Sequence, residues 1–195
     1  MHGMIYDELK SYVEARHGSE TWKLLLRESG VGWPKLYLPI RSYSDEDALA
    51  LVTTASRLTG AQASAILEDF GEYLVPSLLE MYGMLIKPEW RTLDLIEHTE
   101  TTIHKVVRET SPGARPAELQ CTRVSQEELL IIYSSQRRMC AVAKGIAKGI
   151  AKHYQEHVLI TESNCMLQGS PTCAISVKLV GAASERNGNW PQWQR

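Results

Sequence analysis

The sequence predicts an α+β fold, with a helical N-terminal lobe and a second lobe that contains a four-stranded antiparallel sheet and a long helix. Apolar residues recur at helical spacing through residues 4–110, and after residue 118 they alternate with polar ones, which is typical of strands. The chain has 195 residues, of which 44% are hydrophobic, as in ordinary globular proteins. This length is sufficient for one well-buried core.

Amphipathic helices are predicted throughout the first half of the chain. The opening helix has an apolar face made of Met4, Ile5, Leu9 and Val13. Later helices are expected at residues 20–28, 45–59, 62–73 and 76–85. Ser44 is the expected N-cap of the third helix, and Pro76 is expected to begin a new one. Two prolines make residues 33–43 a connector.

The helix predicted at residues 93–110 matters most for function. Its apolar face consists of Leu93, Ile96, Ile103 and Val107, and it stops at Ser111, Pro112 and Gly113. His104 borders this face, whereas His98 lies on the opposite, polar side. We therefore expect the imidazole of His104 to point inward, where it could bind a metal. The alternatives are a surface pair with Glu100, four residues earlier, and a hydrogen-bonded core histidine.

Four strands and one long helix are predicted in the second half. The strands cover residues 119–124, 129–135, 157–163 and 173–180, and the helix covers residues 139–156. A polar turn joins the first two strands into a hairpin, and a turn with Gly169 and Pro171 joins the last two. The sheet is therefore expected to be antiparallel.

Charge and composition favour neither nucleic acid nor a membrane as a partner. The chain has 21 basic and 23 acidic residues, and its formal net charge is −2. Its apolar runs are shorter than the roughly 20 residues that span a bilayer, and its start is too acidic for a signal peptide, so a cytoplasmic protein is expected. We expect residues 1–181 to form a single domain and residues 182–195 to form a mobile tail.

A polar cluster is predicted at the end of the second strand. Tyr133, Ser135 and Arg137 occupy alternate positions of YSSQRRMC and should project from one face of the sheet. A guanidinium offers a planar fork to carboxylates, and nearby hydroxyls can add hydrogen bonds. The trio is therefore a candidate clamp for two propionate-like groups. The alternative is a solvent-facing strand end.

These residues resemble the H-NOX (haem nitric oxide/oxygen binding) family, which is related to the sensor domain of soluble guanylate cyclase. Tyr133-x-Ser135-x-Arg137 resembles the family's propionate-binding signature, and IHKVVRETSPGARP resembles its proximal segment. The opening MHGMIYDELKSYVEARHG and the stretch FGEYL are also similar to family sequence. The resemblance covers about residues 1–180.

The resemblance implies a haem b between the two lobes, with His104 as the fifth iron ligand and Tyr133, Ser135 and Arg137 on the propionates. In the family, a diatomic gas binds at the sixth position, and nitric oxide can release the histidine. The implied function is a sensor of nitric oxide and carbon monoxide, not an enzyme. It would signal to a separate effector, such as a histidine kinase or a cyclic-di-nucleotide enzyme.

The distal pocket of such a sensor is expected to be apolar. Oxygen-binding relatives have a tyrosine at the position of Val142, so the hydrogen-bond donor that stabilises bound oxygen is missing. The same space is expected to be lined by Ile5, Leu9, Leu74, Val142 and Ile146. On the proximal side, Pro116 and Ala117 replace two adjacent prolines of the family, so a flatter haem is expected.

Three of the four cysteines are expected to converge, because Cys165 and Cys173 flank a turn and Cys140 begins the long helix. Some bacterial H-NOX proteins have a zinc site of this kind, and Glu162 stands where their fourth ligand, a histidine, is expected. The resemblance thus implies zinc on Cys140, Cys165, Cys173 and Glu162. Reduced buried thiols and a redox-sensing thiol cluster are the alternatives.

A different function is also open at this point. The ending CMLQGSPTC resembles ligand-binding domains of the 4-vinyl reductase class, so a haem-free small-molecule sensor, or a zinc/thiol redox sensor, is the alternative. An enzyme is not favoured, because paired catalytic carboxylates, a glycine-rich phosphate loop and a nucleophile motif are missing from the sequence.

Overall fold

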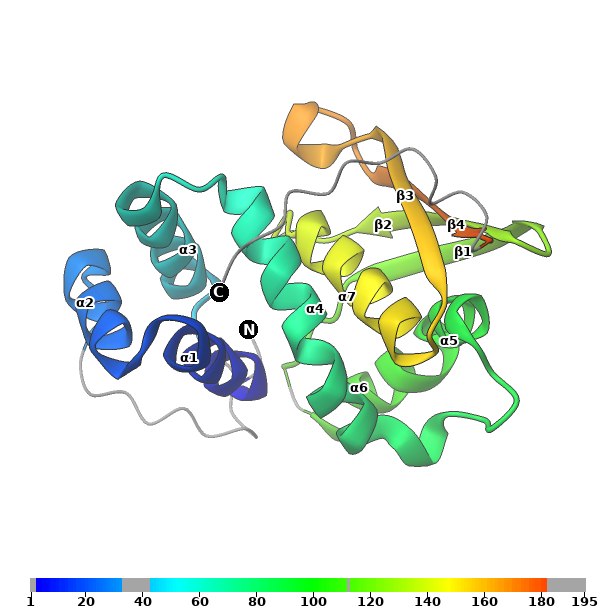
Figure 1. Cartoon of the computed structure of the whole chain (residues 1–195), viewed down its shortest axis with the longest axis horizontal. Coiled ribbons are helices and arrows are strands. Elements are labelled where there is room, and N and C mark those ends of the chain that lie inside the picture. The colour runs from blue at the N-terminus through cyan, green and yellow to red at the C-terminus, as the bar shows by residue number, and fades with distance from the viewer. Residues whose placement is uncertain (1–2, 33–42, 112, 182–195) are drawn as a thin grey trace.

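A computed structural model describes residues 3–32, 43–111 and 113–181 of the chain. Its elements are α1 (Gly3–His17), α2 (Ser19–Ser29), α3 (Asp45–Thr59), α4 (Ala63–Tyr82), the 3-10 turn η1 (Gly83–Leu85), α5 (Thr92–His98), the π turn η2 (Glu100–His104), α6 (Lys105–Thr110), β1 (Glu118–Ser125), β2 (Glu128–Ser134), α7 (Cys140–His153), β3 (His157–Asn164), η3 (Met166–Gln168) and β4 (Cys173–Val180). Helices α1–α3 form a helical lobe, α5 to β4 form a sheet lobe, and α4 runs between them (Figure 1). The predicted α+β architecture is confirmed.

Local sequence explains the ends of α3. The hydroxyl of Ser44 accepts a hydrogen bond from the backbone N–H of Asp47 at 3.2 Å, which confirms the predicted N-cap. The helix ends at Gly60, whose φ of 73° is a left-handed conformation that glycine adopts without strain. The connector predicted at residues 33–43 falls almost entirely on residues 33–42, which lie outside the described residues.

Helix α4 is continuous, so the break predicted at Pro76 is wrong. A proline inside a helix removes one hydrogen bond and costs roughly 3 kcal/mol. The residues just before it, Leu74 and Val75, are almost fully buried, and they pack into two different hydrophobic cores. Packing on both sides of α4 therefore outweighs the local cost of the proline.

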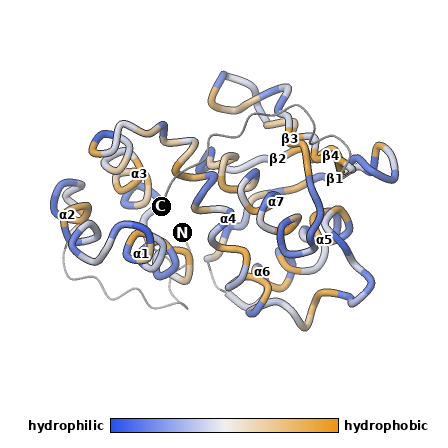
Figure 2. The backbone as a smooth tube through the Cα atoms, in the orientation of Figure 1, coloured by the Kyte–Doolittle hydropathy of each residue, from blue (hydrophilic) through white to orange (hydrophobic). Residues whose placement is uncertain are grey.

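Helix α7 crosses α4 at very short range because glycines lie at the crossing. A Cβ atom added to Gly145 would lie 1.9 Å from the carbonyl oxygen of Glu68, and one added to Gly71 would lie 2.3 Å from that of Val142. Hydrophobic and hydrophilic residues alternate along both helices (Figure 2). The glycines thus set how closely α7 and its apolar face approach α4.

The sheet has the strand order β1-β2-β4-β3, and all neighbouring strands are antiparallel, as predicted. The central strands β2 and β4 contribute the buried residues Leu129, Ile131, Ile175 and Val177. Helix α7 covers one face of the sheet (Figure 1). It stops at His153, before the expected end at residue 156, because Gln155 has a φ of 57° and turns the chain into β3.

Two hydrophobic cores lie on either side of α4. The core of the helical lobe contains Tyr6, Leu9, Trp22 and Leu51, together with Phe70 and Leu74 of α4. The core of the sheet lobe contains Leu95, Leu129, Ile150 and Val177, together with Val75 of α4. Helix α4 therefore belongs to both cores and defines the boundary between the lobes.

Within residues 3–32, 43–111 and 113–181, no helix combines the length and the apolar character that a membrane span requires. The tail predicted at residues 182–195 lies outside the described residues.

Candidate functional site

A cavity of about 330 Å³ lies between the two cores. This volume is within the range of cofactor and small-molecule sites, about 300–1,000 Å³. Most of the lining side chains are apolar, and about half of the lining residues come from α1, α4, α5 and α7. They include the whole predicted distal group, Ile5, Leu9, Leu74, Val142 and Ile146.

His104 lies in the wall of this cavity, at the end of the π turn η2. Its side chain is 18% exposed, and burial lowers its pKa below the usual value, although the neighbouring Glu100 carboxylate acts in the opposite direction. Burial thus favours the neutral imidazole, which is the form that binds metals. His98 is placed differently: it stacks on Trp90 at 4.6 Å and its Nδ1 lies 2.9 Å from the carbonyl oxygen of Asp94.

The single helix predicted at residues 93–110 is wrong, because α5, η2 and α6 replace it. The backbone N–H of His104 donates to the carbonyl of Thr99, five residues back, at 2.9 Å. Hydroxyls of Thr101 and Thr102 both donate to the carbonyl of His98 and compete with the regular helical pattern. Single-turn π bulges are frequent at functional sites.

Glu100 collects three donors beside His104. Its carboxylate lies 2.9 Å from Nδ1 of His104, and it accepts hydrogen bonds from the Arg108 guanidinium at 2.7 Å and the Leu119 N–H at 3.2 Å. Burial favours the neutral acid, yet His104 and Arg108 together hold the pKa of Glu100 below its usual value. The alternative pairing of His104 with Glu100 is therefore present, but it is not a surface pair, because His104 lines the cavity. Two features of the sequence indicate this pair: the i,i+4 spacing of Glu100 and His104, and the interruption of the apolar helix face by Glu100.

Tyr133, Ser135 and Arg137 also line the cavity, although the predicted arrangement on one sheet face is only partly right. Strand β2 ends at Ser134 and the chain turns at Gln136 and Arg137, so Ser135 and Arg137 lie beyond the strand. The Ser135 hydroxyl accepts the backbone N–H of Arg137 at 3.3 Å and stabilises this turn. Burial raises the pKa of the Tyr133 phenol, which therefore stays protonated and able to donate.

Two partners of Arg137 were not predicted. Its Nε donates to Asp45 at 2.8 Å, and its Nη1 donates to the carbonyl of Arg115 at 2.5 Å. Asp45 begins α3 in the helical lobe, 92 residues away in sequence. No local pattern connects these positions, so sequence reasoning had no signal for the pair.

A phenol in the cavity wall was also missed. Tyr82 lines the cavity at the end of α4, and burial raises its pKa. It continues the spacing of Phe70, Leu74 and Leu78 along one helical face. The predicted break at Pro76 hid this continuity. Ala117, expected on the proximal side, lines the cavity as well.

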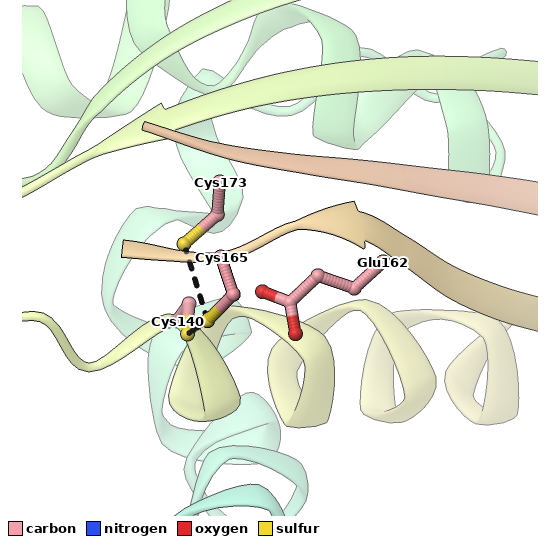
Figure 3. A group of neighbouring side chains, drawn as sticks. All are labelled: Cys140, Glu162, Cys165 and Cys173. Atoms are coloured by element: carbon pink, nitrogen blue, oxygen red, sulfur yellow. Dashed lines mark hydrogen bonds between the residues drawn. The ribbon is translucent and has the colours of Figure 1, made fainter. Parts of the chain in front are cut away.

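A second cluster lies outside the cavity, where the side chains of Cys140, Cys165, Cys173 and Glu162 point toward one another (Figure 3). The sulfur of Cys165 is 3.7 Å from that of Cys140 and 3.9 Å from that of Cys173. All four ligand atoms lie within 4.8 Å of one another, so the predicted convergence is present. Burial raises the pKa values of the Cys140 and Cys173 thiols.

The carboxylate of Glu162 is oriented by Lys144, whose ammonium lies 2.9 Å from Oε2. Its Oε1 atom is buried and has no hydrogen-bond partner among the described residues. Although burial favours the neutral acid, Lys144 holds the pKa of Glu162 below its usual value. Cys121 lies apart on β1, half-buried against the sheet-lobe core, and burial raises its pKa to about 11.

Comparisons with known proteins agree with this arrangement. The fold is similar to that of an H-NOX protein from S. oneidensis in the Fe(II)NO ligation state, with 22% identity, a TM-score of 0.86 and coverage of 93% of this chain and 100% of that chain. It is also similar to unliganded Fe(II) H-NOX from K. algicida (20% identity, TM-score 0.84, 93% and 97% covered) and to the I5F mutant of T. tengcongensis H-NOX (17%, 0.81, 93% and 98%). Residues 2–162 match the model of the Haem-NO-binding family. The chain therefore belongs to the Haem-NO-binding, or H-NOX, family.

Proposed function

We propose that this chain is a haem-based sensor of diatomic gases, with haem b in the cavity between the two cores. The observation that carries the proposal is that one cavity brings together His104 and the trio of Tyr133, Ser135 and Arg137. Apolar walls suit a porphyrin ring, a neutral imidazole suits its iron, and a guanidinium with hydroxyls suits its carboxylates. The cavity offers all three kinds of group.

When bound, haem supplies a ferrous iron with one coordination position for a gas molecule. His104 would hold the iron from the π turn, and Arg137 would hold the propionates. Leu74 and Val142 would exclude water from the gas side without donating a hydrogen bond. Tyr82 could donate a hydrogen bond, but it lies eight residues beyond Leu74 in α4. At about 1.5 Å per residue, this places Tyr82 about 12 Å from Leu74 along the helix axis.

Release of His104 is the proposed signal. Residues 100–110, all of which the structure describes, are partly or fully exposed and none is fully buried, so η2 and α6 should move at lower cost than the core helices once the imidazole is free. We propose that a separate effector, such as a histidine kinase or a cyclic-di-nucleotide enzyme, responds to this movement. The chain itself acts as a sensor and not as a catalyst in this proposal. Nothing in the family match supports the alternative of a haem-free domain similar to 4-vinyl reductases.

The absorption spectrum of the ferrous protein tests the function. Protein reconstituted with haem should show a Soret band that shifts with nitric oxide and with carbon monoxide, but not in oxygen-saturated buffer. Oxygen needs a hydrogen-bond donor more than the other two gases do, and Val142 provides none. In Val142→Tyr, a response to oxygen should appear. A chain that takes up no haem would refute the function, and a lasting oxygen response of the wild type would refute only the apolar gas pocket.

Zinc binding by Cys140, Cys165, Cys173 and Glu162 is a second proposal, favoured by the spacing of their ligand atoms. A tetrahedral zinc with Zn–S bonds of about 2.3 Å keeps its sulfur ligands about 3.8 Å apart. The two sulfur–sulfur distances of 3.7 and 3.9 Å fit this value. The backbone N–H of Met166 also donates to the Cys173 sulfur at 3.2 Å, a contact that stabilises a thiolate.

Metal analysis tests the zinc proposal. Protein purified without chelators should contain close to one zinc per chain, and Cys165→Ser should lose it because a hydroxyl is a poor zinc ligand. Cys121→Ser is the matched control and should keep the metal, since Cys121 lies outside the cluster. Metal-free protein with three freely titrating thiols would leave the cluster as reduced buried cysteines.

A further inference from the structure

The environment of Glu100 assigns a role to this residue that neither the haem pocket nor the zinc cluster explains. Its carboxylate is 23% exposed and lies where η2, α6 and the start of β1 meet. It contacts the ring nitrogen Nδ1 of His104 and accepts hydrogen bonds from the guanidinium of Arg108 and the backbone N–H of Leu119. Each contact comes from a different element, so the carboxylate is fixed independently of the histidine.

This carboxylate determines which nitrogen of His104 can bind a metal. An ionised carboxylate only accepts hydrogen bonds, and Arg108 and Leu119 are both donors. At 2.9 Å from Glu100, Nδ1 must therefore carry the proton of the neutral ring. The lone pair is then on Nε2, and the ring is held in one orientation within the cavity wall.

The same contact changes the strength of the ligand. A carboxylate that accepts the N–H of a metal-binding histidine raises the basicity of the ring and strengthens its bond to the metal. Here the partner is the carboxylate of Glu100, which is a stronger acceptor than a backbone carbonyl or water, and a guanidinium holds it in place. The segment that carries His104 is otherwise only partly buried: none of residues 100–110 is fully buried, and Ile103 packs against the sheet-lobe core.

We propose that Glu100 is the positioning residue of His104: it fixes the Nε2-binding tautomer and strengthens the iron–histidine bond, and so sets how readily a gas releases His104. This inference rests on the proposed function, in which His104 holds the haem iron. It predicts a sensor whose histidine is retained more firmly than it would be without the carboxylate. Contacts to Arg108 and Leu119 then link release of His104 to α6 and β1.

The test is the iron–histidine stretching band in the resonance Raman spectrum of the ferrous, haem-loaded full chain. Glu100→Gln keeps an acceptor of the same shape but removes the charge, and Glu100→Leu removes the acceptor. We expect the band to shift to lower wavenumber from wild type to Glu100→Gln, and further in Glu100→Leu. Arg108→Met is the matched control: it removes one partner of Glu100 but leaves the contact with His104, so its shift should be smaller than that of Glu100→Leu.

The outcomes separate this inference from the function on which it rests. If the iron–histidine band is absent from wild-type protein, or persists in His104→Ala, then His104 is not the ligand and the haem function itself fails. If the band is present and depends on His104 but stays unchanged in both Glu100 variants, only the role of Glu100 is overturned. Should Glu100→Leu fail to fold, the isosteric Glu100→Gln decides alone, because an unshifted band there contradicts the role of the charge.

Discussion

Replacing His104 by alanine is expected to abolish the protein's own bond to the haem iron, whereas His98→Ala should leave it intact. His104 lies in the cavity wall, and its Nδ1 is occupied by Glu100, so Nε2 is available to the iron. His98 is stacked on Trp90, and its Nδ1 contacts its own helix. The measurement is the absorption spectrum and haem content of each variant after reconstitution.

Free imidazole provides the control for the His104 variant. The substitution removes a ring from the wall of an apolar cavity, and an imidazole molecule of the same shape can fill that space. Added imidazole should therefore restore the haem spectrum of His104→Ala and leave that of His98→Ala unchanged. If His98→Ala instead loses the ligand, the assignment of the proximal histidine is wrong, and the position of η2 in the cavity wall has no functional meaning.

Sequence patterns predicted the features of this fold that depend on neighbouring residues. The alternating segment in β4 has the expected bounds, residues 173–180, and the apolar periodicity of α1 and α7 places Leu9 and Ile146 in the cavity wall. Periodicity works at these positions because burial of one face dominates the local free energy. The family resemblance, confirmed over residues 2–162, rests on the same segments.

The errors arise where contacts distant in sequence, or competing hydrogen bonds, decide the structure. Pro76 stays within α4 because two cores hold the helix on both sides, and a single sequence does not show that second core. At the π turn, the hydroxyls of Thr101 and Thr102 both donate to the carbonyl of His98 and compete with the regular helical pattern. The ion pair between Arg137 and Asp45 joins residues of different lobes.

Arg137→Ala is expected to release haem much faster than wild type. The side chain of Arg137 is only 19% exposed, and its guanidinium is the cation of the proposed propionate clamp. Removing one partner of a partly buried charge pair costs about 2–5 kcal/mol, because the remaining charge is poorly compensated. At about 1.4 kcal/mol per tenfold, this corresponds to haem loss that is roughly 30- to 4,000-fold faster. Transfer of haem to an excess of a haem-binding acceptor protein measures the rate.

Two further variants separate the shape of the guanidinium from its charge. Arg137→Lys keeps a positive charge but not the planar fork, so its haem loss should lie between those of wild type and Arg137→Ala. The neighbouring Arg138 is exposed, lies outside the cavity lining and has a φ of 52°, a conformation that asparagine tolerates well. Arg138→Asn therefore removes an equal charge without strain and should not change the rate. Equal rates for wild type, Arg137→Ala and Arg138→Asn would mean that Arg137 serves the ion pair with Asp45 and not the propionates.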